Sequence, residues 1–110
     1  MTAEQAIALA RAIRPNELEE EVLAHWILEL EQNLALLVRN EGSVACNGSP
    51  VTRADLRIPA PFDRVYWTYL VAMIDLSLGD QAAYGISYPL FEETRNAYAR
   101  WYQSHAGGKL

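Results

Sequence analysis

The sequence predicts an all-α domain, a small bundle of about four helices with one long loop. Apolar residues recur at the helical period over most of the chain. Residues that favour helix starts and ends flank these stretches. The chain has 110 residues, and neither half is long enough for a core of its own. We therefore expect a single domain spanning residues 1–110.

The first helix is predicted over residues 2–14. Thr2 and Gln5 have the spacing of a capping box, in which hydroxyl and amide satisfy the exposed N–H groups of a helix start. A short apolar stripe follows, formed by Ile7, Leu9, Ala10 and Ile13. Pro15 ends the helix because proline disfavours helical backbone in the residue before it.

The second helix is predicted over residues 17–40, with Asn16 as its N-cap and Glu17, Glu19, Glu20 and Glu21 near its start, where the helix dipole favours negative charge. Leucine and isoleucine then form a seam at spacings of four and three, consisting of Leu23, Ile27, Leu30, Leu34 and Leu37. We expect a polar opposite face, with Glu29, Glu31, Gln32 and Asn33.

The third helix is predicted over residues 62–78, with Pro61 placed to open it. Apolar residues cover most of its circumference, which is typical of a central helix or of one covered by another subunit. Gly79 and Asp80 then supply a C-cap and a new N-cap. The fourth helix is predicted over residues 81–105, with Pro89 expected to kink it or to start its main part.

Residues 41–61 form the predicted loop, and residues 106–110 a flexible tail. Asn47-Gly48 is a tight-turn dipeptide, which the residues on either side could flank as a small hairpin. A short extended piece is expected at 55–58. A loop this long in a small domain is usually functional or disordered, and its composition suggests that it contacts a partner.

Charge and aromatic residues are distributed unevenly along the chain. Residues 1–42 carry eight acidic and three basic residues, whereas the remainder balances, for a net charge of −5. This argues against a general nucleic-acid clamp, which needs clustered lysine and arginine. Ten of the eleven aromatic residues follow residue 61. They are typical either of a core alone or of a core with a subunit interface.

Motifs of catalysis and metal binding are absent from the sequence. Cys46 is the only cysteine, and His25 and His105 have no neighbours at metal-ligand spacing. Glu19–Glu21 is interpreted as a solvated helix start. We expect no enzymatic activity, no metal and no cofactor. The N-terminus lacks the features of a signal peptide, and no apolar run is long enough to span a bilayer, so a cytoplasmic location is the default expectation.

Several short stretches, in this order, resemble small phage and prophage proteins of the head–tail connector (adaptor) family. The resemblance covers nearly the whole chain, and the matching stretches are residues 3–6, 14–16, 24–31, 58–66, 69–75 and 79–80, followed by Tyr84, Phe91, Tyr98 and 99–102. The most distinctive of these is Ile58-Pro-Ala-Pro-Phe-Asp-Arg-Val-Tyr66. Pro89 departs from the family pattern, because similar sequences continue helically there.

The resemblance implies an all-helical virion protein that assembles as a homo-oligomeric ring beneath the portal. Such a ring extends the DNA channel, carries DNA only as passing cargo and docks the tail. The family-motif residues with structural roles would be Trp26, Pro59, Pro61, Phe62, Asp63, Tyr66, Tyr69, Asp75, Tyr84, Phe91, Tyr98, Trp101 and Tyr102.

The resemblance also implies that portal or neighbouring subunits bind to the 41–58 loop or to the 103–110 tail. The interface candidates are Arg53, Asp55, Arg57 and Lys109. The protein would lie in the host cytoplasm before assembly and in the virion neck afterwards, without membrane contact. The alternative is a small helical interaction or regulatory module of a prophage that forms no ring.

Overall fold

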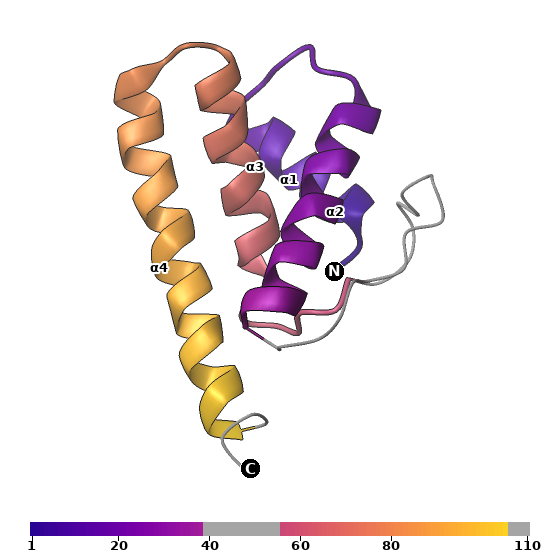
Figure 1. Cartoon of the computed structure of the whole chain (residues 1–110). Coiled ribbons are helices and arrows are strands. Elements are labelled where there is room, and N and C mark those ends of the chain that lie inside the picture. Colours follow the sequence, from indigo (N-terminus) through magenta and orange to yellow (C-terminus); the bar gives the residue numbers. More distant parts are fainter. Residues whose placement is uncertain (39–55, 106–110) are drawn as a thin grey trace.

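The structure is a computed structural model that describes residues 1–38 and 56–105, and these residues form four α-helices and no strand (Figure 1). The helices are α1 (Ala3–Ile13), α2 (Glu20–Leu37), α3 (Arg64–Ser77) and α4 (Gln81–His105). They share one hydrophobic core. The prediction of a small all-α bundle is confirmed.

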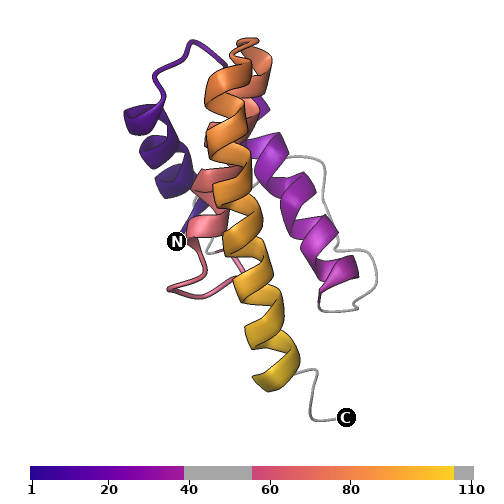
Figure 2. The ribbon, with the colours of Figure 1, turned by 90° about the vertical axis from the view of Figure 1, so that its left-hand side faces the viewer.

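Helix α3 is the centre of the bundle. Among the described helices it alone packs against the other three, whereas α4 packs against α3 only. With α4 facing the viewer in Figure 2, α1 lies to one side and α2 to the other. Val65, Tyr66, Leu70 and Ile74 of α3 are fully buried. A helix that is apolar on nearly all sides therefore occupies the centre of this domain. This is the first of the two interpretations of its sequence, a central helix or one covered by another subunit.

Helix α1 begins at the predicted capping box. The Gln5 backbone N–H donates to Thr2 Oγ1 at 3.1 Å, and the Thr2 backbone N–H donates to Gln5 Oε1 at 2.9 Å. Both bonds satisfy N–H groups that have no partner within the helix. The helix ends at Ile13, with Arg14 as its C-cap just before Pro15, as expected from the proline.

The predicted start of α2 is wrong by three residues. Asn16 is not the N-cap, because its side chain bonds the connecting segment instead: Nδ2 donates to the Arg14 carbonyl at 3.0 Å, and Oδ1 accepts from the Leu18 N–H at 3.0 Å. Such local bonds compete with helix formation. Glu19 takes the N-cap position. The predicted end at Asn40 lies outside the described residues, and Leu37, the last residue of the predicted seam, is 80% exposed.

Pro61 does not open α3. The Phe62 N–H donates to the Pro59 carbonyl at 2.9 Å, so a turn occupies residues 59–62 and the helix begins at Arg64. The predicted corner between α3 and α4 is confirmed. Gly79 adopts a φ of +74°, which a residue without Cβ reaches at low cost, and Asp80 Oδ1 accepts the Ala83 N–H at 3.1 Å.

Helix α4 runs without a break through Pro89, so the expectation that the main helix starts there is wrong. A proline ring clashes with the carbonyl four residues earlier and leaves that carbonyl without its helical donor. Here the earlier residue is Gly85, and both Gly85 and Pro89 are exposed. Because the position faces water, the Gly85 carbonyl can be hydrated and the helix continues.

The predicted hairpin around Asn47-Gly48 and the 106–110 tail lie outside the described residues, as does most of the predicted loop. Its last residues are described. The Leu56 N–H donates to the Met1 carbonyl at 2.9 Å, and Ile58 is buried in the core. The end of the loop is therefore attached to both the N-terminus and the bundle.

Replacing Pro89 with alanine is expected to stabilise the protein. The substitution restores an N–H donor to the Gly85 carbonyl and removes the ring clash, for a net gain of about 2 kcal/mol after the added freedom of the unfolded chain. Urea unfolding followed by circular dichroism should show a higher midpoint with an unchanged slope. Pro59→Ala, at an exposed position outside any helix, is the matched control and should change the midpoint far less. An unaltered midpoint for Pro89→Ala would contradict this account.

Candidate functional site

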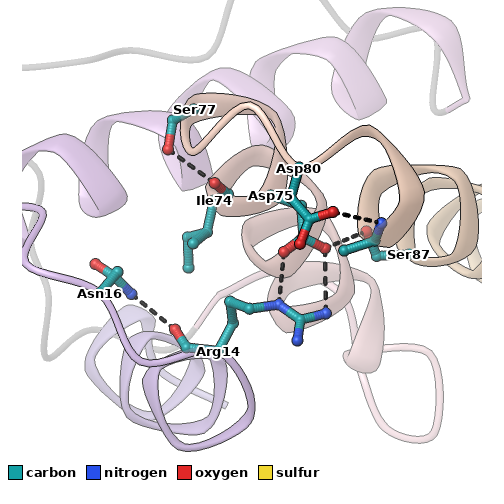
Figure 3. Close-up of polar contacts among 8 residues, drawn as sticks. Arg14, Asn16, Ile74, Asp75, Ser77, Asp80 and Ser87 are labelled. Carbon is teal, nitrogen blue, oxygen red and sulfur yellow. Dashed lines mark hydrogen bonds and ion pairs between the residues drawn. The ribbon is translucent and has the colours of Figure 1, made fainter.

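A buried polar cluster joins three helices at one end of the bundle (Figure 3). Arg14 Nε lies 2.5 Å from Asp75 Oδ1, and Arg14 Nη2 lies 3.3 Å from Oδ2. The Ser87 hydroxyl donates to Asp75 Oδ2 at 2.7 Å. The Asp75 side chain is fully buried, whereas the Arg14 side chain is 37% exposed. One carboxylate, in the last turn of α3, therefore binds both the C-cap residue of α1 and a serine on the inner face of α4.

Local sequence explains how the three side chains meet. Pro15 stops α1 at Ile13, which turns Arg14 out of the helix and towards α3. Asp75 occupies the last turn of α3, and Ser87 lies on the face of α4 that packs against it. A bidentate guanidinium–carboxylate pair fixes orientation as well as distance. Since both carboxylate oxygens already accept hydrogen bonds, this cluster is a structural junction.

A second buried cluster connects α2 to the end of the predicted loop. The Tyr66 hydroxyl donates to Glu31 Oε1 at 2.7 Å and accepts from the Ile58 N–H at 3.0 Å. The Arg57 N–H donates to Glu31 Oε2 at 3.1 Å. Glu31 is only 6% exposed, so its predicted place on the polar face of the helix is wrong. Its carboxylate holds residues 57 and 58 against the bundle.

The aromatic residues form two groups along α4. Phe62 packs against Tyr98 and Trp101, with ring centroids 6.0 and 5.2 Å apart. Further along the same helix, Tyr88 lies between Tyr84 and Phe91, and Tyr69 of α3 packs on Phe91 at 5.0 Å. Tilted contacts at these distances add to the stabilisation that ring burial supplies. The first group extends the core past the N-terminal end of α3.

In the second group, the surroundings of the Tyr69 hydroxyl disfavour its ionisation. Burial raises the pKa of Tyr69 above its usual value, and the charges of Glu29, Tyr88 and Tyr84 add to that shift. These four side chains therefore lie close enough to interact electrostatically. They come from α2, α3 and α4, although α4 itself packs against α3 only.

The structure divides the family-motif residues by burial. Those that are buried are Tyr66, Asp75, Phe91 and Tyr98; those that are half-buried are Trp26, Phe62, Asp63, Tyr69, Tyr84, Trp101 and Tyr102. Pro59 and Pro61 are exposed. Most of the motif residues therefore pack the bundle rather than converge on one site.

Of the four interface candidates, only Arg57 falls within the described residues, where it is exposed. Arg53, Asp55 and Lys109 lie outside them. Sequence reasoning did not single out Arg14, Ser87 or Glu31. The sequence did contain a signal for Arg14 and Asp75. Arg14 directly precedes a proline that ends the helix, and Asp75 lies within an otherwise apolar helix, so a charged partner could have been expected for each. For Glu31 the only signal was its place next to Leu30 in the apolar seam.

Among the surface hollows of the described residues, one adjoins Phe62 and another adjoins Asp75. One, of about 240 Å³, is lined by Pro61, Phe62, Arg64, Glu93, Thr94 and Ala97. The other, of about 140 Å³, is lined by Asp75, Leu76, Gly79, Asp80, Gln81 and Tyr84. Within residues 1–38 and 56–105, no group of three or more metal-ligating side chains gathers.

Comparison with protein-family models, with curated proteins and with solved structures finds no match. No helix within the described residues has the length and apolar character needed to cross a membrane.

Losing one charge of the Arg14–Asp75 pair should destabilise the protein more than losing both. Removing the arginine (Arg14→Met) leaves the Asp75 carboxylate buried with Ser87 as its remaining side-chain donor, and we expect a loss of about 3 kcal/mol in the free energy of unfolding. Replacing both groups (Arg14→Met with Asp75→Leu) should recover much of that loss. Urea unfolding of the two single variants and the double variant measures the coupling. Additive losses would show that the pair does not hold the helices together.

The Tyr66 hydroxyl is expected to be essential for holding the end of the loop. Tyr66→Phe leaves the Ile58 N–H and one Glu31 oxygen without this partner in a buried place, at a cost of about 2 kcal/mol. Amide hydrogen exchange at Ile58 should accelerate more than exchange within α4. Tyr84→Phe, a half-buried tyrosine at the far end of the bundle, is the control. Equal exchange at Ile58 in both variants would refute the proposed anchor.

Proposed function

We propose that this chain is a head–tail connector of a phage or prophage, forming a ring beneath the portal. The observation that carries the proposal is the resemblance of nearly the whole chain to that family, centred on residues 58–66. The proposal assigns the protein an assembly role in the virion. It predicts portal and tail proteins as partners, a place in the host cytoplasm before assembly and a place in the virion neck afterwards.

The positions of the motif residues support the proposal. Phe62 precedes the central helix and Tyr66 lies in its first turn. Asp75 ties the other end of that helix to α1 and α4, and Trp101 packs on Phe62. A motif made of packing residues specifies a fold rather than a chemistry. That is what an assembly protein requires, because its function depends on the shape and the surface that the fold presents.

The surface of α2 also suits a channel wall. Residues 15–38 contain no lysine or arginine, and Glu20, Glu21 and Glu29 are exposed. A surface without basic residues offers little attraction to phosphate, so DNA can pass without binding to it. In this arrangement the start of α2, with Glu20 and Glu21, faces the lumen of the ring.

The proposal is tested by producing the chain together with the portal protein encoded beside it. We expect both proteins to co-purify, and electron microscopy to show a ring of this chain added to one end of the portal. Phe62→Ser is the folding control, because it disrupts the packing around Trp101 and should abolish the added ring. A fully folded chain that never joins portal would contradict the proposal.

The same experiment separates the alternative of a regulatory module. That class of protein would form a one-to-one complex with a different protein and leave the portal unaltered. A gene located between capsid and tail genes favours the connector, and one among regulatory genes favours the module.

A further inference from the structure

The two flanks of α4 carry opposite chemistry. The acidic flank consists of Glu29 of α2, Tyr69 of α3, Asp80 at the α3–α4 corner, and Tyr84 and Tyr88 of α4. The basic flank consists of Arg64 of α3 and of Ile86, Leu90, Ala97 and Arg100 of α4. Leu90 follows Tyr88 by two residues, which at about 100° per residue places the two on nearly opposite sides of the helix. The flanks are therefore separate surfaces of one domain.

The acidic flank lacks local compensation. Residues 15–38 and 65–94 contain no lysine or arginine, so no basic side chain from α2, from the α3–α4 corner or from the first half of α4 opposes its carboxylates. Glu29 is 50% exposed, with His25 as its neighbour at 3.9 Å. Asp80 is exposed and lines the hollow of about 140 Å³ beside Tyr84. Arg95, further along α4, is paired with Glu92 and lies over Phe91.

The aromatic rings of the acidic flank add a second attraction for a cation. Tyr84 and Tyr88 are stacked, with centroids 5.3 Å apart, and both are half-buried, so part of each ring faces solvent. A guanidinium binds both to carboxylates and to the faces of aromatic rings. The chemistry that fits this flank is an arginine with some apolar surface around it.

The basic flank of the same chain has that chemistry. Arg64 and Arg100 are exposed, and Ile86 and Leu90 are 76% and 41% exposed. Arg64 lies over Trp67 and lines the hollow of about 240 Å³ with Ala97. Glu93 is the acidic residue within that hollow. Two complementary surfaces on different sides of one domain favour a head-to-tail contact, which closes into a ring when the rotation permits.

We propose that the acidic flank of one copy binds the basic flank of the next, with Arg100 of one subunit against Glu29 of its neighbour. The contact deepens the proposed function, on which it rests, by assigning the two surfaces that join neighbouring subunits. Exposed Ile86 and Leu90 then become covered by the aromatic side chains of the neighbour. The interface is heterologous, so each subunit uses both flanks.

Charge exchange tests the contact in the full-length chain. Sedimentation velocity is measured for the wild-type protein and three variants: Glu29→Arg, Arg100→Glu and the double variant. The wild type should self-associate at an ionic strength of about 0.05 M and dissociate at about 0.5 M, because salt screens the charges. Each single variant should associate roughly 100-fold more weakly, since like charges then face each other. The double variant should regain association, because its charges are complementary again.

Two controls keep the result specific. Ala12→Arg and Ala12→Glu make charge changes of the same signs on the exposed face of α1, and both should behave as wild type. Circular dichroism and the thermal midpoint should show that all the variants are folded. A wild type that stays monomeric at low ionic strength, or a folded double variant that fails to regain association, overturns the contact. The contact is also overturned if the wild type binds a basic segment of another protein but does not associate with itself.

The portal assay distinguishes failure of this contact from failure of the proposed function. If Glu29→Arg and Arg100→Glu join the portal ring as well as wild type does, the connector function stands and the contact is wrong. If the wild type associates as described but never joins portal, the contact stands and the proposed function fails.

Discussion

The Arg14–Asp75 ion pair is the interaction on which the arrangement of the bundle depends. The Asp75 carboxylate is fully buried and receives donors from the C-cap of α1 and from Ser87 of α4. An unpaired buried carboxylate is very unfavourable, so α1 and α4 must sit where Arg14 and Ser87 reach it. Apolar burial alone lets helices slide and rotate, whereas a bidentate pair admits one geometry.

A second constraint acts at the other end of α3. The Tyr66 hydroxyl bridges the Glu31 carboxylate and the Ile58 N–H, which ties α2 to the segment that leads into α3. The central helix is thus held by apolar contacts along its length and by a polar cluster near each end. The residues of the family-like motif occupy these positions. Tyr66 and Asp75 are the motif residues that take part in these two clusters.

The surface combines features that the core does not require. A flank with exposed carboxylates and half-buried tyrosines lies on one side of α4, and exposed arginines with isoleucine and leucine lie on the other. Helix α4 packs against α3 only among the described helices, so both flanks remain open. The helix has 25 residues against 14 in α3, and Figure 1 shows its C-terminal turns extending past the bundle. Much of the surface of this helix is therefore left uncovered by the other described helices.

The sequence by itself determined the helical class, the capping box of α1 and the corner at Gly79-Asp80, because caps and apolar periodicity act locally. It left α3 as either a central helix or one covered by another subunit. It did not determine the start of α2, where Asn16 bonds its own connecting segment, or the continuity of α4 at Pro89, which depends on that face meeting water. The partnership of Arg14, Asp75 and Ser87 and the burial of Glu31 were decided by tertiary structure alone. These contacts join residues far apart in sequence, and only the packing of helices around α3 brings their charges and hydroxyls within bonding distance.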